Sequence, residues 1–129
     1  PPLMGNIRSV RDLEVYSAAM DAAMEIFERT KAFPKEERYA MVDQMSRSSR
    51  SVCANLGEAW RRRRSERHSC TKLGDAESEA EETRVWIEFA FRCGYLPADP
   101  AEQLDETYDQ ILGKLVRMIS QSEDWLLRT

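Results

Sequence analysis

Apolar residues recur every three or four positions in four separate segments of the chain. The first segment follows Ser9 and Asp12, whose spacing resembles a helix-capping box with a short carboxylate in place of the usual Glu. Its apolar positions share one helical face: Leu13, Tyr16, Met20, Ala23, Met24 and Phe27. This periodicity predicts a first helix from about Val10 to about Lys31.

The second segment begins after Phe33 and Pro34. The ring of Pro34 disfavours helical geometry at Phe33 and therefore ends the first helix. Glu36 and Glu37 suit the positive end of a new helix, which we expect to continue to about Arg63. Its inner face is a heptad-like stripe interrupted by two polar residues: Met41, Met45, Ser48, Val52, Asn55, Leu56 and Ala59.

A third helix is predicted between Ser65, a suitable N-cap, and Gly94, a suitable left-handed residue after the last turn. Tyr95 would supply the apolar contact that often accompanies such a glycine. The inner positions of this helix are mostly small: Leu73, Ala76, Ala80, Thr83, Ile87 and Ala90. Small side chains indicate that a neighbouring helix approaches closely.

A fourth helix is predicted after Asp99, Pro100 and Glu102, which suit its N-cap, first and third positions. One face of this helix carries the following residues: Leu104, Tyr108, Ile111, Leu112, Leu115, Ile119, Ser122 and Leu126. Four amphipathic helices with short connections favour an all-α fold, an antiparallel up-and-down four-helix bundle. We expect this domain over residues 9–129, after a flexible N-terminus of residues 1–8.

Several short motifs occur together in an order and spacing that resemble a known family. They are residues 11–16 (RDLEVY), 33–39 (FPKEERY), 44–48 (QMSRS), 54–59 (ANLGEA), 79–83 (EAEET), 86–87 (WI) and 93–96 (CGYL). Over about residues 8–120 the chain resembles the bacterial four-helix bundles that include the 23S rRNA intervening-sequence proteins. The resemblance implies a pentameric barrel. It also implies a relation to the accessory proteins of diversity-generating retroelements, which bind a reverse transcriptase and nucleic acid.

Composition places the chain among soluble helical proteins of one domain. It has 129 residues, of which 42% are hydrophobic and 33% charged. No apolar run approaches the roughly 20 residues that cross a bilayer, and residues 1–5 lack the blocks of a signal peptide, so we expect a cytoplasmic location. Cys53, Cys70 and Cys93 are an odd number without a C-x-x-C pair, which indicates buried thiols and no disulfide framework.

Charge is distributed unevenly along the chain, although the net charge is only −4. Residues 46–72 carry eight basic and two acidic side chains, whereas residues 75–109 carry eleven acidic and two basic ones. The basic residues form the predicted nucleic-acid-binding set: Arg47, Arg50, Arg61, Arg62, Arg63, Arg64, Arg67 and Lys72. Arginine suits phosphate geometry, but the same residues could instead complement a helix dipole or pair with acidic side chains at a subunit interface.

Two further pairs of residues have predicted structural roles. Asn55 and Glu58 are expected to form a polar pair in the core, where a single polar residue often determines helix register or assembly state. Trp86 and Phe89 lie off the small-residue face of the third helix, so we expect them at an oligomer interface.

Catalytic and metal-binding chemistry is not indicated. A di-iron bundle needs Glu-x-x-His motifs from two helices, and His68 is the single histidine of the chain. The serine-rich residues 46–51 lack a nucleophile elbow, and no glycine-rich phosphate loop is present. We therefore expect neither enzyme activity nor a metal or cofactor.

Together these patterns predict a non-enzymatic homo-oligomer, pentameric by its resemblance, that binds RNA or DNA phosphate through its arginines. The alternative is a scaffold or adaptor whose arginines contact other subunits or a protein partner, such as the reverse transcriptase that the resemblance suggests.

Overall fold

The computed structural model describes residues 7–126, all of whose regular elements are helical. The four long helices are α2 (Glu14–Thr30), α3 (Met41–Arg61), α4 (Glu66–Arg92) and α5 (Ala98–Ser120). Three short 3-10 turns accompany them: η1 (Val10–Asp12), η2 (Lys35–Glu37) and η3 (Ser122–Asp124). Most of the predicted flexible N-terminus, residues 1–6, lies outside the described residues, as do residues 127–129.

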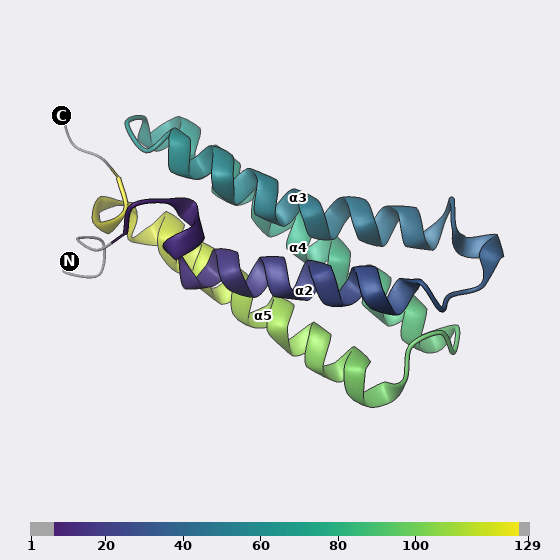
Figure 1. Ribbon diagram of the computed structural model, residues 1–129. Coiled ribbons are helices and arrows are strands. Elements are labelled where there is room, and N and C mark those ends of the chain that lie inside the picture. The colour runs from purple at the N-terminus through teal and green to yellow at the C-terminus, as the bar shows by residue number, and fades with distance from the viewer. Residues whose placement is uncertain (1–6, 127–129) are drawn as a thin grey trace.

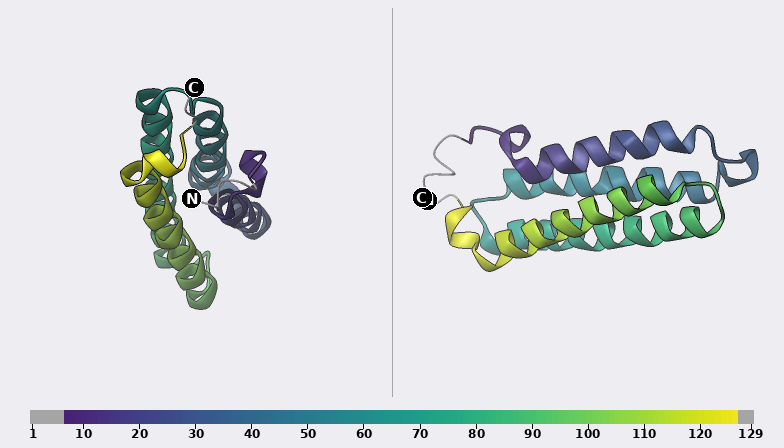
Figure 2. Two further views of the ribbon diagram at one scale, coloured as in Figure 1. Left: turned by 90° about the vertical axis from the view of Figure 1, so that its left-hand side faces the viewer. Right: turned by 90° about the horizontal axis from the view of Figure 1, so that it is seen from below.

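The long helices run up and down as an elongated bundle (Figure 1). Each packs against two neighbours: α3 contacts α2 and α4, and α5 contacts α4 and α2. The α3–α4 connection lies at one end of the bundle, and the α2–α3 and α4–α5 connections lie at the other end (Figures 1 and 2). The predicted antiparallel four-helix bundle is therefore confirmed.

The core is tightest between α3 and α4, as the small residues predicted. All of the inner positions predicted for these two helices are buried. Ala59, Ala76 and Ala80 are fully shielded from solvent, which lets the two helix backbones approach closely. Within this seam the Oγ1 of Thr83 donates a hydrogen bond to the Oγ of Ser48 over 2.8 Å, so that both buried hydroxyls are paired.

The face of α2 that packs inward differs from the prediction. Of the predicted face, Leu13 and Ala23 are buried, but Met20, Met24 and Phe27 are 37%, 51% and 41% exposed. The other buried residues of α2 are Val15, Ala19, Ala22 and Ile26. The helix is apolar over more than half of its circumference, so periodicity alone did not distinguish the two faces. The alanine-rich face packs inward because its small side chains allow α2 to sit close to both α3 and α5.

The predicted first helix is divided into two elements. The capping box is confirmed, since Ser9 Oγ accepts a hydrogen bond from Arg11 N and Asp12 Oδ2 accepts one from Ser9 N. It caps only the turn η1, because Leu13 is extended (φ −80°, ψ 130°) and α2 begins at the next residue, Glu14.

The second helix begins later than predicted. Glu36 and Glu37 lie in the turn η2, and the non-helical backbone of Ala40 (φ −125°, ψ −101°) delays the start of α3 to Met41. This connection is held to the end of α4: the hydroxyl of Tyr95 donates to Glu37 over 2.9 Å. The far end of α3 is Arg61, two residues before the predicted end.

The termini of α4 match the prediction, and the start of α5 does not. Ser65 Oγ accepts a hydrogen bond from His68 N, and Gly94 has the left-handed backbone expected after the last turn (φ +80°). The N-cap of α5 is Pro97, so Asp99 and Pro100 lie inside the first turn and the predicted Asp N-cap is wrong by two residues. Pro100 is tolerated at its observed and at its predicted position because the N–H groups of the first turn have no hydrogen-bond partner within the helix.

Candidate nucleic-acid interface

A four-residue connection, residues 62–65, joins α3 to α4 and gathers arginines from both helices at one end of the bundle. The N–H of Arg62 donates to the carbonyl oxygens of Glu58 and Ala59, which closes the last turn of α3. Ser65 then caps α4, so the chain reverses between two helix ends that pack side by side. We call the exposed arginines here, Arg61, Arg62, Arg64 and Arg67, the arginine end.

Arg63 points inward and is structural. Its guanidinium carbon lies 3.4 Å from the ring centroid of Trp60 and 5.9 Å from that of Trp125. Its Nε donates to the carbonyl oxygen of Trp60 over 2.9 Å. Partial burial lowers the pKa of Arg63, because desolvation disfavours its charged form. Stacking on Trp60 therefore occupies the guanidinium of one of the eight predicted binding residues, which stays partly exposed.

Trp125 anchors this end of the bundle, a role that the sequence analysis did not predict. It follows α5 and the turn η3, is 4% exposed, and meets Trp60 edge to face at 5.5 Å. Its Nε1 donates to Ser69 Oγ over 2.9 Å, and that hydroxyl donates to the carbonyl oxygen of Ala59 over 3.0 Å. The C-terminal segment thus ties the end of α3 to the start of α4. Trp125 lies three residues after Ser122 of the predicted inner face, so its burial agrees with the apolar spacing, whereas its partners on α3 and α4 needed the tertiary structure.

Arg47 and Lys72 are engaged in ion pairs between α3 and α4. The guanidinium of Arg47 binds Glu79 at 2.9 Å and Glu82 at 2.6 Å, and these hydrogen bonds raise the pKa of Arg47 and lower that of Glu82. Lys72 Nζ lies 3.6 Å from Glu58. Carboxylates of α4 therefore bind Arg47 of α3, and a carboxylate of α3 binds Lys72 of α4.

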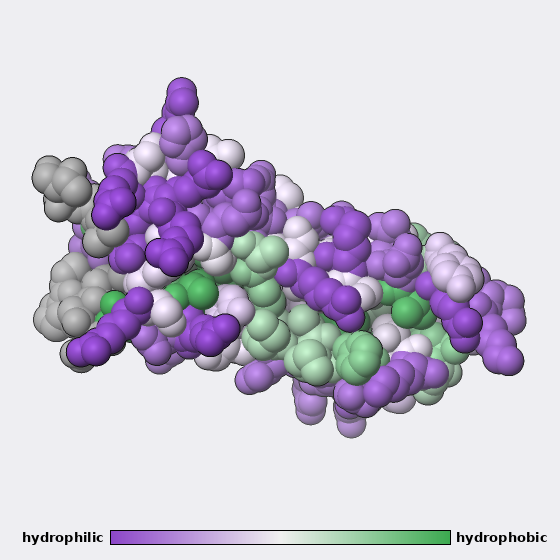
Figure 3. Space-filling model, turned by 45° about the horizontal axis from the view of Figure 1, so that its top comes forward, coloured by the Kyte–Doolittle hydropathy of each residue, from purple (hydrophilic) through white to green (hydrophobic). Residues whose placement is uncertain are grey.

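Five of the eight predicted residues stay exposed and make no ion pair with residues 7–126. They are Arg50, Arg61, Arg62, Arg64 and Arg67. Hydrophilic side chains cover this end of the molecule in Figure 3. The structure thus divides the predicted set into five free cations and three that stabilise the bundle.

Asn55 and Glu58 do not form the predicted polar pair. The Nδ2 of Asn55 donates to the carbonyl and hydroxyl oxygens of Ser51, one turn earlier in α3. Glu58 is exposed and pairs with Lys72, so its assignment to the core is wrong. Although it lies only three residues after the buried Asn55, its side chain is on the solvent-exposed side of α3. The interhelical polar contact in the core is instead the one between Ser48 and Thr83.

Two apolar strips lie on the surface, one on α2 and one on α4. The α4 strip is Val85, Trp86 and Phe89, in which Val85 and Phe89 are 44% and 50% exposed and the rings of Trp86 and Phe89 lie 5.5 Å apart. The α2 strip is Met20, Met24 and Phe27. Figure 3 shows an apolar band along α2 on the side that this helix shares with α3.

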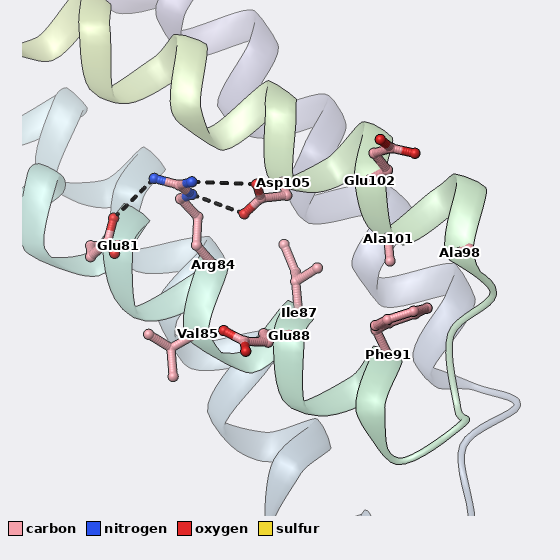
Figure 4. Close-up of a pocket in the computed structure, with 10 residues that line it drawn as sticks. All are labelled: Glu81, Arg84, Val85, Ile87, Glu88, Phe91, Ala98, Ala101, Glu102 and Asp105. Atoms are coloured by element: carbon pink, nitrogen blue, oxygen red, sulfur yellow. Dashed lines mark hydrogen bonds and ion pairs between the residues drawn. The ribbon is translucent and has the colours of Figure 1, made fainter.

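A hollow of about 460 Å³ lies between α4 and α5 near their connection (Figure 4). Its lining combines an apolar floor with carboxylates: Glu81, Arg84, Val85, Ile87, Glu88, Phe91, Ala98, Ala101, Glu102 and Asp105. Arg84 is already bound to Asp105 at 2.9 Å and to Glu81 at 3.3 Å. The hollow is therefore acidic, and it repels the anions that the arginine end would attract.

The described residues offer little for other chemistry. Burial raises the pKa of Cys53 to about 11, which keeps this thiol protonated at neutral pH. Residues 7–126 contain no group of three or more His, Cys, Asp or Glu side chains suited to a metal ion. None of the helices in that range is both long and apolar enough to cross a membrane.

Comparison with known proteins agrees with the bundle and with the motifs. The sequence profile of the family described as 23S rRNA-intervening sequence protein matches residues 11–117. A protein of unknown function from Bacteroides thetaiotaomicron, of the S23 ribosomal protein family, has a similar crystal structure. Its sequence is 28% identical to this chain, and the two structures have a TM-score of 0.75. The match covers 83% of this chain and 96% of the Bacteroides protein. No curated protein matches the chain. Since the profile covers most of its length, the chain belongs to the family of 23S rRNA-intervening sequence proteins.

Proposed function

We propose that this protein is a non-enzymatic homo-oligomer that binds the phosphate backbone of nucleic acid through its arginine end and Arg50. The observation that carries the proposal is the set of five exposed arginines that make no ion pair with residues 7–126. Outside this set Arg29, Arg84 and Arg92 pair with carboxylates, whereas Arg8, Arg11, Arg38 and Arg117 also make no ion pair with residues 7–126. What distinguishes the arginine end is that four such side chains lie within residues 61–67. Like charges held close together repel one another, and an anion that binds between them relieves this repulsion.

Phosphate is the anion that this arrangement suits best. A guanidinium donates two parallel hydrogen bonds to phosphate oxygens, and several neutralised phosphates release counterions. The acidic hollow between α4 and α5 restricts a polyanion to the other end of the molecule. The net charge of −4 is compatible with such localised binding.

The two apolar strips support self-association. Trp86 donates to Glu82, the partner of Arg47, so this residue of the α4 strip lies on the side of α4 toward α3, while Val85 of the same strip lines the hollow toward α5. Phe27 and the α4 strip lie near the end of the bundle where α2 and α4 end. Contact between the α2 strip of one copy and the α4 strip of the next is heterologous, and such contacts form a ring when the rotation between copies closes. A pentamer of this kind would turn the outer side of α3, with Arg50 and Arg61, toward its axis.

The test is binding of a structured RNA and a DNA duplex at about 50 mM and about 200 mM salt. Replacing Arg61, Arg62 and Arg64 by Gln should weaken binding at least tenfold and flatten its salt dependence. The control is Arg92→Gln, which removes a cation at the opposite end of the bundle that is paired with Glu88 at 3.0 Å. Absence of binding at low salt, or equal binding by the triple variant, would overturn the proposal.

A scaffold or adaptor role is the second candidate, and the acidic hollow favours it. In that case the arginine end of one copy, or of a partner protein, would contact carboxylates such as Glu102 and Glu88. Changing Arg61, Arg62 and Arg64 to Glu should then dissociate the oligomer in sedimentation velocity experiments. Nucleic-acid binding predicts instead an intact oligomer that has lost its ligand. A reverse transcriptase partner is part of this second candidate.

A further inference from the structure

We propose that the arginine end recognises double-helical nucleic acid by the phosphates that flank its grooves, without stacking on bases or reading their sequence. This inference rests on the proposed function and names the form of nucleic acid that the site accepts. It follows from three features of the described residues: the burial of the nearby indoles, the position of the exposed aromatic rings, and the placement of the arginines.

The indoles beside the arginines are not available to bases. Trp60 is 8% exposed and Trp125 is 4% exposed. One face of Trp60 is covered by the guanidinium of Arg63 at 3.4 Å, and the edge-to-face contact with Trp125 occupies more of its surface. Proteins that hold single strands without sequence preference stack successive bases on exposed aromatic rings. The indoles at this end of the bundle stabilise the turn and leave no such platform.

The exposed Phe and Tyr side chains of residues 7–126 lie far from the arginine end. They are Phe27, Tyr39, Phe89 and Phe91. All four belong to the end of the bundle where α2 and α4 end, opposite the α3–α4 turn (Figure 1). The exposed ring that does lie beside the arginines is the imidazole of His68, whose Nε2 is 3.5 Å from Arg67. One ring is not enough to hold a run of bases.

The arginines are carried by two adjacent helix ends and the connection between them. Arg61 is the last residue of α3, Arg62 and Arg64 lie in the connection, and Arg67 lies in the first turn of α4, so the four side chains do not start from one straight row along a helix. A double helix offers two rows, which border a groove of about 6 or 12 Å width. Packed helices are separated by about 8–10 Å, a spacing similar to that of the two rows. The splayed arrangement therefore suits a groove flanked by phosphates better than a single strand.

The charge density of the ligand acts in the same direction. A DNA duplex carries one charge per about 1.7 Å of its axis. The slope of log affinity against log salt concentration is about −0.9 per neutralised phosphate for a duplex and about −0.7 for a single strand. Arg50 and the arginine end provide up to five such contacts in each subunit. Because no stacking compensates for the lower charge density of a single strand, we expect duplex binding to be at least about tenfold tighter.

The experiment measures the affinity of the intact protein for three labelled probes by fluorescence anisotropy at about 50–200 mM salt. The probes are a mixed-sequence single strand of about 20 nucleotides, the same strand annealed to its complement, and a duplex of unrelated sequence. DNA and RNA are tested in parallel. The proposal predicts duplexes that bind at least about tenfold tighter than the strand, and two duplex sequences that agree within about twofold. Equal or tighter binding of the single strand would overturn it and leave the proposed function intact. Absence of binding to every probe would instead overturn the proposed function.

Two variants add a readout that distinguishes backbone from base contact. His68→Ala should leave duplex affinity within about twofold, whereas Arg62→Gln combined with Arg64→Gln should weaken it at least about tenfold. A 2-aminopurine placed within the duplex should keep its quenched fluorescence on binding, since the base stays stacked. A rise in that fluorescence, or a large loss of affinity in His68→Ala, would show base contact and refute the inference.

Discussion

Replacing Tyr108 by Phe should stabilise this protein. Tyr108 lies in the middle of α5, is completely shielded from solvent, and its hydroxyl has no hydrogen-bond partner among residues 7–126. Burial, and to a lesser extent the nearby Cys53 and Glu25, raises the pKa of Tyr108, so the group is a neutral phenol at all ordinary pH values. The phenol therefore loses its hydrogen bonds to water on folding and gains none in return.

The magnitude follows from two opposing effects. An unpaired buried hydroxyl costs about 1–3 kcal/mol in desolvation. Removing its oxygen leaves a small void, and a void of roughly 10–15 Å³ costs about 0.3 kcal/mol. The net expectation is a gain of about 1 kcal/mol in the free energy of unfolding, or a rise of about 3–6 °C in the melting temperature. Urea and thermal unfolding followed by circular dichroism measure both quantities.

Tyr95→Phe is the matched control. The hydroxyl of Tyr95 donates a hydrogen bond to Glu37 over 2.9 Å and so keeps a partner in the folded protein. Removing this hydroxyl should therefore lower the melting temperature. The two variants thus make the same chemical change with opposite expected signs. A loss of more than about 1 kcal/mol in Tyr108→Phe would refute the reasoning, because it would mean that an ordered water or another group satisfies this hydroxyl in solution.

Four further outcomes are expected. Gly94→Ala should destabilise the protein by about 1 kcal/mol in urea unfolding, since φ is +80° and no neighbouring atom would contact the new methyl group; an unchanged midpoint would contradict the left-handed cap. Ala80→Leu should destabilise it by about 1–3 kcal/mol in the same assay because this residue is fully buried between α3 and α4, and a neutral result would mean that the seam can expand. Met24→Glu and Phe89→Glu should each dissociate the proposed oligomer in sedimentation velocity while helical content is retained; an intact oligomer in both would exclude the two strips as its interface. In a variant with Cys70→Ser and Cys93→Ser, which removes the two more accessible thiols, Cys53 with its pKa raised to about 11 should resist a thiol reagent at pH 8 in the folded protein and react once unfolded; rapid reaction of the folded variant would show that the helices open there.

The family motifs and the helix periodicity were sufficient to predict the bundle. The inner face of α3 could be predicted because that helix has one apolar stripe opposed by charged residues. The inner face of α4 was marked by its small residues, since Val85, Phe89 and Phe91 make this helix apolar on a second side. The capping signals at Ser65 and Gly94 were also sufficient, since they depend on neighbours within a few residues. The start of α5 was predicted wrongly because Pro100 fits more than one position of a first turn.

The sequence by itself determined that the chain makes four amphipathic helices, which of its segments are basic, and that α3 and α4 pack through small residues. Only the tertiary structure decided which face of α2 packs inward, because that helix is apolar on two sides and the choice depends on the space between α3 and α5. It also decided which arginines are free. Arg63 stacks on Trp60. Arg47 is bound by Glu79 and Glu82, which lie more than thirty positions away in the chain. Local patterns determine helices because their hydrogen bonds are local, whereas the availability of a charge depends on partners that only the packed bundle brings together.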